Sequence, residues 1–243
     1  MNNETQKLLE TISRSRQPTA PFTIGTHALP HAALAYSMCG EDLYLRKIFK
    51  RRVASGEKGI YVDIGSASPI EISNTYYFYC LGWRGLCIDA NVDMAASWSA
   101  VRSEDTYITA AVGEIEGNAQ FLRHKTHPGM SRMAFAQDRP AEDYEQSCSV
   151  NVRRLDSLFA EHIGDRRIQF MTIDVEGAEL GVLKSNDWRR WRPEIIMLEC
   201  INFAFDAPFE AAPIAFLAEQ GYVLRDKINS NIVMSDVINA NAL

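Results

Sequence analysis

Acidic residues stand at or near the ends of two apolar segments, where they could transfer protons or bind a metal ion. Asp174 follows Phe170–Ile173, Glu176 comes shortly after it, and Glu199 ends the apolar run Ile195–Leu198. A carboxylate at such a position can act as a general base toward a weakly acidic hydroxyl group, and a metal ion can lower the pKa of that hydroxyl instead. We predict Asp174 and Glu176 as the catalytic residues.

Structural explanations compete with this interpretation. Acidic residues in the first turn of a helix favour its dipole, which would account for Glu176 and Glu179 without catalysis. Glu199 fits a structural role as well as a role in a pocket. His124 and His127 are alternative bases or substrate contacts, although a histidine in a polar loop is more often simply solvated. Three acids could also hold a divalent cation, but the chain has no histidine-rich ligand spacing, and we predict no metal site.

A second group of residues predicts a cofactor site in the first half of the chain. Asp63 and Gly65 follow the short apolar run Gly59–Val62, and Ser66 comes next. A glycine at this point lets the backbone turn tightly and approach a bound molecule. Asp89 ends the next apolar run, where an acid can accept hydrogen bonds from ribose hydroxyls. A NAD-binding loop would carry more glycines for the pyrophosphate, so the segment favours a cofactor without phosphates.

These residues require alternating strands and helices to position them. Strands are predicted at 59–63, 86–89, 107–112, 168–173 and 194–199, and helices at 70–81, 92–102, 155–163, 176–184 and 209–220. This alternation predicts an α/β fold with a parallel sheet. Two last strands, 221–225 and 232–235, are too close along the chain to be parallel. A Rossmann-like seven-stranded sheet with an antiparallel C-terminal strand is the plan of class I S-adenosylmethionine-dependent methyltransferases.

The rest of the chain forms flanking parts in this interpretation. Residues 1–57 are expected to form an N-terminal helical arm, and 58–243 the methyltransferase domain. Within the arm we predict helices at 4–13 and from about 43 to 53, with an irregular proline-containing stretch at 17–31. Short extra strands are expected at 118–123 and 150–153. The long irregular segment 124–147 is predicted to be a lid loop on the substrate side.

Composition excludes some functions and favours a compartment. The chain has 243 residues, is 47% hydrophobic and carries a formal net charge of −6, which fits a single globular domain and argues against a nucleic-acid partner. Its five cysteines show no CxxC spacing, as expected for reduced thiols in the cytoplasm. No signal peptide and no membrane-spanning apolar segment are apparent. A homodimer is one option for its assembly.

Several short stretches together resemble the FkbM family of methyltransferases. They read VDIGS, GWRGLCIDAN, TAAVG, RRLDSL and IDVEGAE, and a GED segment near Tyr36 resembles the opening of that family. The resemblance extends over about Ser37 to Glu199. It implies a class I fold, S-adenosyl-L-methionine as the methyl donor and O-methylation of small molecules or sugars. The absence of a second glycine after Gly65 is a departure from the motif.

The resemblance also implies roles for individual residues. Those near the first three strand ends would bind the donor: Asp63, Gly65 and Ser66 its methionine end, Asp89 and Ala90 the ribose, and Ala111 and Val112 the adenine. Asp174 and Glu176 would line the methyl-transfer pocket.

The predicted function is O-methylation of a sugar hydroxyl in a bacterial glycan or lipo-oligosaccharide, with fucose of a nodulation factor as one specific option. A polyketide or other secondary metabolite is the alternative acceptor. A non-catalytic cofactor-binding module is the alternative of another class, against which the intact Asp63, Asp89 and Asp174 argue. Further candidate acceptor contacts, for most of which core packing or surface charge is an equal explanation, are Trp98, Tyr144, Phe203, Phe205, Arg132 and Arg139.

Overall fold

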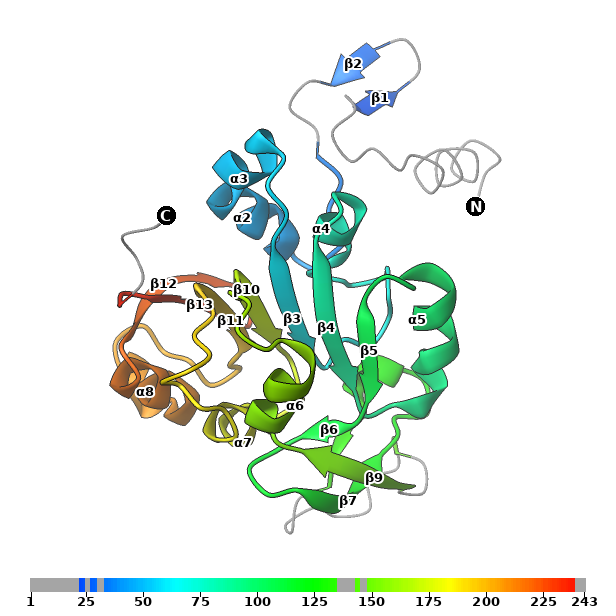
Figure 1. Cartoon of the computed structure of the whole chain (residues 1–243), viewed down its shortest axis with the longest axis vertical. Helices are drawn as coiled ribbons and strands as arrows, with labels where there is room; N and C mark the ends of the chain where they lie inside the picture. The colour runs from blue at the N-terminus through cyan, green and yellow to red at the C-terminus, as the bar shows by residue number, and fades with distance from the viewer. Residues whose placement is uncertain (1–21, 25–26, 30–32, 135–142, 145–147, 239–243) are drawn as a thin grey trace.

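A seven-stranded sheet forms the centre of the molecule. The computed structural model describes residues 22–24, 27–29, 33–134, 143–144 and 148–238. The strand order is β12-β13-β11-β10-β3-β4-β5 (Figure 1). The strands are β3 (Ile60–Ile64), β4 (Arg84–Asp89), β5 (Thr106–Thr109), β10 (Phe170–Ile173), β11 (Ile195–Glu199), β12 (Tyr222–Ile228) and β13 (Asn231–Asp236). Because β13 runs antiparallel to both of its neighbours and the other pairs are parallel, the predicted fold with one reversed strand is confirmed.

The central strands form where apolar residues can be buried on both faces. Every residue of β10 is buried, and so is every residue of β11 except the last, Glu199. Side chains alternate between the two faces, so Val62 and Ile64 join one hydrophobic core while Tyr61 joins the other. Along β10 and β11 acidic side chains stand only at the carboxyl ends, with Asp174 just after β10 and Glu199 as the last residue of β11.

Helices cover both faces of the sheet. On one face they are α6 (Leu155–His162), α7 (Glu179–Lys184) and α8 (Ala212–Glu219), which share a core with Val62. On the other face they are α2 (Glu41–Ile48), α4 (Tyr76–Cys80) and α5 (Ala95–Val101), which pack with Tyr61. The remaining helical elements are α3 (Lys50–Ser55) and the 3₁₀ helices η1 (Val92–Met94), η2 (Pro128–Met130) and η3 (Pro208–Glu210). None of the described helices is long and apolar enough to cross a bilayer.

A smaller four-stranded sheet lies beyond the arrowheads of β3, β4 and β5 (Figure 1). It consists of β6 (Ala111–Val112), β7 (Gly117–Leu122), β8 (Arg132–Met133) and β9 (Cys148–Arg153). The extra strands predicted at 118–123 and 150–153 are confirmed as β7 and β9. The strand predicted at 107–112 is two strands instead, because β6 leaves the main sheet to pair with β9. This small sheet borders the side of the main sheet on which the parallel strands end, which we call the carboxyl edge.

Several predicted helices are shorter than expected. The helix expected at 176–184 begins at Glu179, because Glu176 and Gly177 have φ angles of 54° and 101°, outside the helical range. The helix expected at 70–81 is confined to Tyr76–Cys80, since Ile72 also has a positive φ. The helix expected up to residue 53 is divided at Phe49 into α2 and α3.

The N-terminal arm differs from its prediction in the part that is described. Residues of the stretch expected to be irregular form an antiparallel pair of strands, β1 (Phe22–Ile24) and β2 (His27–Leu29). The predicted helix at 4–13 lies outside the described residues. In contrast, Leu45 of α2 is fully buried against the sheet, so this helix is packed into the same core as the strands.

Candidate active site

A narrow cavity opens where the parallel strands end. Its lining comes from the ends of β3 and β4, from residues just after β3, β4, β5 and β10, and from the small sheet with the segment before β8. The residues are Ile64, Gly65, Ala67, Ile88, Asp89, Ala90, Ala110, Ala111, Val112, Phe121, Gly129, Ser131, Arg132, Met133, Asp174 and Val175. Its volume is about 50 Å³. Ligand sites of enzymes commonly measure roughly 300–1,000 Å³. The cavity as it stands is therefore smaller than a usual nucleoside site.

Gly65 allows the first strand to turn against the strand beside it. Its φ is 80°, and a Cβ atom at this position would lie 1.7 Å from the carbonyl oxygen of Asp174. Its N–H and that of Ser66 both donate to the carbonyl of Ile88, at 2.9 and 3.2 Å. The tight turn predicted from the glycine is therefore present, and it brings the ends of β3, β4 and β10 together.

Asp89 is held rigidly in the cavity wall. Its two carboxylate oxygens accept hydrogen bonds from the backbone N–H groups of Ala67 and Asn91, at 2.8 and 2.7 Å. Burial raises the pKa of Asp89, and these two hydrogen bonds oppose the rise. Each oxygen keeps a lone pair for a further donor, as binding of two ribose hydroxyls would need.

Asp63 faces away from the cavity. Its carboxylate is buried and accepts a hydrogen bond of 2.6 Å from the hydroxyl of Thr75, and burial raises its pKa to about 6. Among the other predicted donor contacts, Gly65, Ala90, Ala111 and Val112 line the cavity, whereas Ser66 does not. The contacts of Asp63 and Ser66 with a donor remain predictions.

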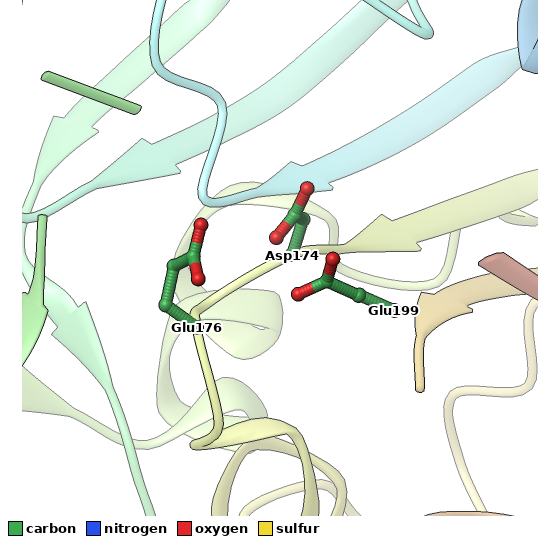
Figure 2. Close-up of side chains that lie close together, drawn as sticks. All are labelled: Asp174, Glu176 and Glu199. Atoms are coloured by element: carbon green, nitrogen blue, oxygen red, sulfur yellow. The ribbon is translucent and has the colours of Figure 1, made fainter. Parts of the chain in front are cut away.

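Three acidic side chains converge beside this cavity. Carboxylate oxygens of Asp174, Glu176 and Glu199 all lie within 4.8 Å of one another (Figure 2). Asp174 directly follows β10, Glu176 stands in the turn before α7, and Glu199 ends the neighbouring strand β11. Because β10 and β11 are neighbours, Glu199 lies beside Asp174 and Glu176, the two predicted catalytic residues. The sequence had left the role of Glu199 open.

The proximity of these acids changes their proton affinity. The carboxyl group of Asp174 lies between the strand ends, where lost hydration raises its pKa to about 8, and repulsion by Glu199 and Glu176 adds to the rise. Burial and the neighbouring carboxylates also raise the pKa values of Glu176 and Glu199. A hydrogen bond with Asp174 opposes the rise at Glu199. The crowding of these three carboxyl groups therefore favours retention of a proton, most of all at Asp174.

Glu179 has the structural role that its position near a helix start suggested. Its side chain is buried, and its Oε1 accepts hydrogen bonds from the N–H groups of Val175 and Gly177, at 3.2 and 3.0 Å. These bonds stabilise the turn that carries Glu176. Because this turn precedes α7, the first-turn explanation for Glu176 does not apply.

The other candidate bases and acceptor contacts lie partly in the cavity wall, partly in the core and partly on the surface. The rings of His124 and Tyr144 have centroids 5.3 Å apart, and neither residue lines the cavity. Trp98 is fully buried and donates from its indole to Ala67, so it belongs to the core. Phe203 is buried, and its neighbour Phe205 is exposed. Arg132 lines the cavity, and its charge opposes the rise in the pKa of Glu176. Arg139 lies outside the described residues, as does much of the predicted lid.

Two supporting contacts were not predicted. Fully buried Arg102 donates to the hydroxyl of Thr75, which in turn donates to Asp63, at 3.1 and 2.6 Å. Buried Glu41 accepts a hydrogen bond of 3.2 Å from Asn231, whose backbone pairs with that of Glu199. The GED segment was a signal for the second contact, since an acid there is otherwise unexplained. No sequence signal distinguishes Arg102 from a surface arginine.

A sheet of this order, with acid-ended strands around one cavity, defines the class I methyltransferase fold. The family model described as the methyltransferase FkbM domain matches residues 63–224, and the chain belongs to this family. A methyltransferase FkbM structure from Methylobacillus flagellatus KT is similar at 15% identity and a TM-score of 0.45, covering 73% of this chain and 43% of that one. This chain thus spans less than half of that protein.

A precorrin-6y C5,15-methyltransferase from Geobacter metallireducens GS-15 is similar at 12% identity and a TM-score of 0.39, covering 79% of this chain and 86% of that one. No curated protein matches the sequence.

Proposed function

We propose that the protein transfers a methyl group from S-adenosyl-L-methionine to a sugar hydroxyl of a glycan or lipo-oligosaccharide. The observation that carries the proposal is the presence of Asp89 and Asp174 in the walls of one cavity, with Glu176 and Glu199 beside Asp174. One acid is suited to a ribose, and the acid cluster is suited to removing a proton.

The residues of the cavity fit this donor. Asp89 would accept hydrogen bonds from the ribose hydroxyls, and the small side chains of Ala110, Ala111 and Val112 leave a flat apolar wall for adenine. Gly65 lets the backbone approach the methionine end without a side chain in the way. Bound S-adenosyl-L-methionine supplies an electrophilic methyl group and leaves as a neutral thioether. The nearby carboxylates favour the positive charge of the donor.

The acid cluster would accept the proton of the acceptor. A sugar hydroxyl is hardly ionised at neutral pH, so its proton must leave as the new C–O bond forms. The raised pKa of Asp174, about 8, makes its ionised form a stronger base than an ordinary carboxylate. Burial keeps this proton affinity high, and the charges of Glu199 and Glu176 add to it. The acceptor oxygen would therefore lie against this cluster.

The test is a methyl-transfer assay with labelled donor and a panel of acceptors. The panel contains deoxysugar glycans, among them a fucosylated lipo-oligosaccharide, together with hydroxylated polyketides. Transfer to a sugar hydroxyl, at a rate lowered by Asp174→Asn but not by Glu161→Gln at an exposed acid, supports the proposal. Transfer to polyketides alone would replace the acceptor class. Donor binding without transfer to any acceptor would support a non-catalytic module.

A further inference from the structure

A second hollow lies on the opposite side of the main sheet, where the parallel strands begin. We call this side the amino edge. It has a volume of about 550 Å³ and is lined by 164–168, 189–192 and Ile238. The first two segments lead into β10 and β11, which start at this edge. Five of the lining residues are arginines: Arg166, Arg167, Arg189, Arg190 and Arg192. In a chain with a net charge of −6, so many basic groups in one hollow require an explanation.

Some of this charge is neutralised by buried acids. Arg192 donates to both carboxylate oxygens of Asp236, at 2.8 and 3.0 Å, and is fixed by this bidentate contact. Arg167 and Arg52 both contact the same oxygen of buried Glu194, at 2.8 and 2.9 Å. Arg52 also lies 3.6 Å from the carboxylate of Glu57, so the charges of this group are balanced, and the positive charge left for a ligand comes from the other arginines.

Three arginines of the hollow have no buried acid to neutralise them. Arg166 donates to the backbone carbonyls of His162 and Ile163 at the end of α6. Arg190 pairs at 3.1 Å with Asp165, but the side chain of Asp165 is 94% exposed, so solvent screens the pair. The side chain of Arg189 has no partner among the described residues.

Two of these guanidinium groups are already held in place. The guanidinium carbon of Arg190 lies 4.2 Å from the ring centre of Trp191, whose indole N–H donates to Gly164 at 2.8 Å. Arg166 is fixed by its contacts with the end of α6. A guanidinium group has five N–H donors, so both side chains keep donors for a ligand. Groups that are fixed before binding lose little conformational freedom when the ligand arrives.

We propose that this hollow binds a small phosphorylated molecule through Arg166, Arg189 and Arg190. The planar guanidinium group donates paired hydrogen bonds to the oxygens of a phosphate. The volume of the hollow is within the range of roughly 300–1,000 Å³ that is usual for small-molecule sites. A membrane or a nucleic acid would instead contact a flat or extended basic surface. The edge is opposite to the acid cluster, so this ligand and the methyl donor occupy separate sites.

The test is isothermal titration calorimetry of the full chain with inorganic pyrophosphate, beside sulfate at the same ionic strength. The variant Arg189→Gln/Arg190→Gln removes two charges from the hollow. The control Lys47→Gln/Lys184→Gln removes two charges from exposed positions elsewhere on the surface. We expect saturable binding of pyrophosphate that is at least about tenfold weaker in the first variant, because charge-assisted hydrogen bonds are lost. The control should remain within about twofold of the unmodified protein.

Thermal unfolding and binding of S-adenosylhomocysteine serve to check that both variants fold. The proposal is overturned if pyrophosphate binds no better than sulfate, or if Arg189→Gln/Arg190→Gln keeps the original affinity. Sedimentation with phosphatidylglycerol vesicles tests whether the hollow binds the phosphate of a lipid headgroup instead. Vesicle binding without pyrophosphate binding would assign the hollow to a membrane surface and likewise overturn the proposal.

Discussion

The two edges of the main sheet both contain buried or crowded charges, but they accommodate them in opposite ways. At the carboxyl edge, like charges are brought together, and burial with the neighbouring carboxylates raises the pKa values of Asp174 and Glu199. At the amino edge, buried Glu194 and Asp236 lie against arginines, so opposite charges are paired. Loss of one partner of a buried pair leaves an unpaired charge and destabilises the fold, whereas crowded like charges cost stability while they are present. The comparison therefore assigns structural roles to the acids of one edge and chemistry to those of the other.

Exchanging an acid for its amide at each edge should have the largest effect and should separate the two roles. Asp174→Asn is expected to lower the turnover rate by about 10²–10⁴-fold, as for loss of a positioned base, while stability is kept or rises. Asp236→Asn removes the partner of Arg192 and is expected to cost about 3 kcal/mol of stability, with normal turnover by the folded fraction. Turnover and urea unfolding measure both effects.

Glu176→Gln belongs beside these variants, because either Asp174 or Glu176 could remove the proton. If both single variants turn over at nearly the original rate on a verified acceptor, the base lies elsewhere. Glu199 and the histidines His124 and His127 would then be the next groups to test. If turnover in Asp236→Asn falls only in proportion to its loss of folded protein, Asp236 has a structural role, as the comparison predicts.

The carboxyl edge was largely predictable because its chemistry follows from strand ends. Acids are tolerated where buried strands end, so the positions of Asp89, Asp174 and Glu199 follow from the sequence. The turn around Glu176 could not, because its positive φ depends on the buried contacts of Glu179 rather than on local propensity. The main sheet was predictable from the alternation of apolar runs with helices.

Features that depend on distant partners were not predictable. Arg102 and Asp105 are spaced like a surface ion pair on a helix, yet both side chains are fully buried. The segment 107–112 has one continuous strand propensity, but pairing with β9 divides it. The basic hollow combines two arginine-containing segments that lie far apart along the chain, and only the sheet brings them together.

Removal of the Asp89 carboxylate should weaken donor binding without abolishing chemistry. Two charge-assisted hydrogen bonds are worth about 1.5–3 kcal/mol each, so Asp89→Ala should raise the dissociation constant of S-adenosyl-L-methionine at least about tenfold. Turnover at saturating donor should change little. The exposed acid Asp93, on the same side of the sheet, provides the control Asp93→Ala. Calorimetry decides the matter, and a change below about threefold would show that Asp89 does not hold the ribose.

The pH dependence of stability should distinguish the crowded edge from the paired one. The pKa of Asp174 rises from 3.8 to about 8 in the folded state. Between these values the folded protein keeps a proton that the unfolded chain releases, so stability falls as pH rises through this window. Asp63, with a pKa raised to about 6, contributes only to the lower part. From pH 6 to 8 the original protein should therefore lose more stability than Asp174→Asn, as measured by urea unfolding. Parallel curves for the two proteins would contradict a raised pKa.

The smallest expected effect is that of removing divalent cations. Asp174, Glu176 and Glu199 have the oxygen ligands and the closeness that a divalent cation requires, as their oxygens lie within 4.8 Å of one another. A bound cation would, however, keep all three ionised and so oppose the rise in the pKa of Asp174 that burial and the neighbouring acids cause. If the cluster acts as a base, EDTA should leave turnover and melting temperature unchanged, and added Mg²⁺ should not raise them. Loss of activity in EDTA that Mg²⁺ restores in the original protein, but not in Glu176→Gln, would instead make these acids metal ligands. The carboxyl edge would then neutralise its charge as the amino edge does, with a cation in place of arginines.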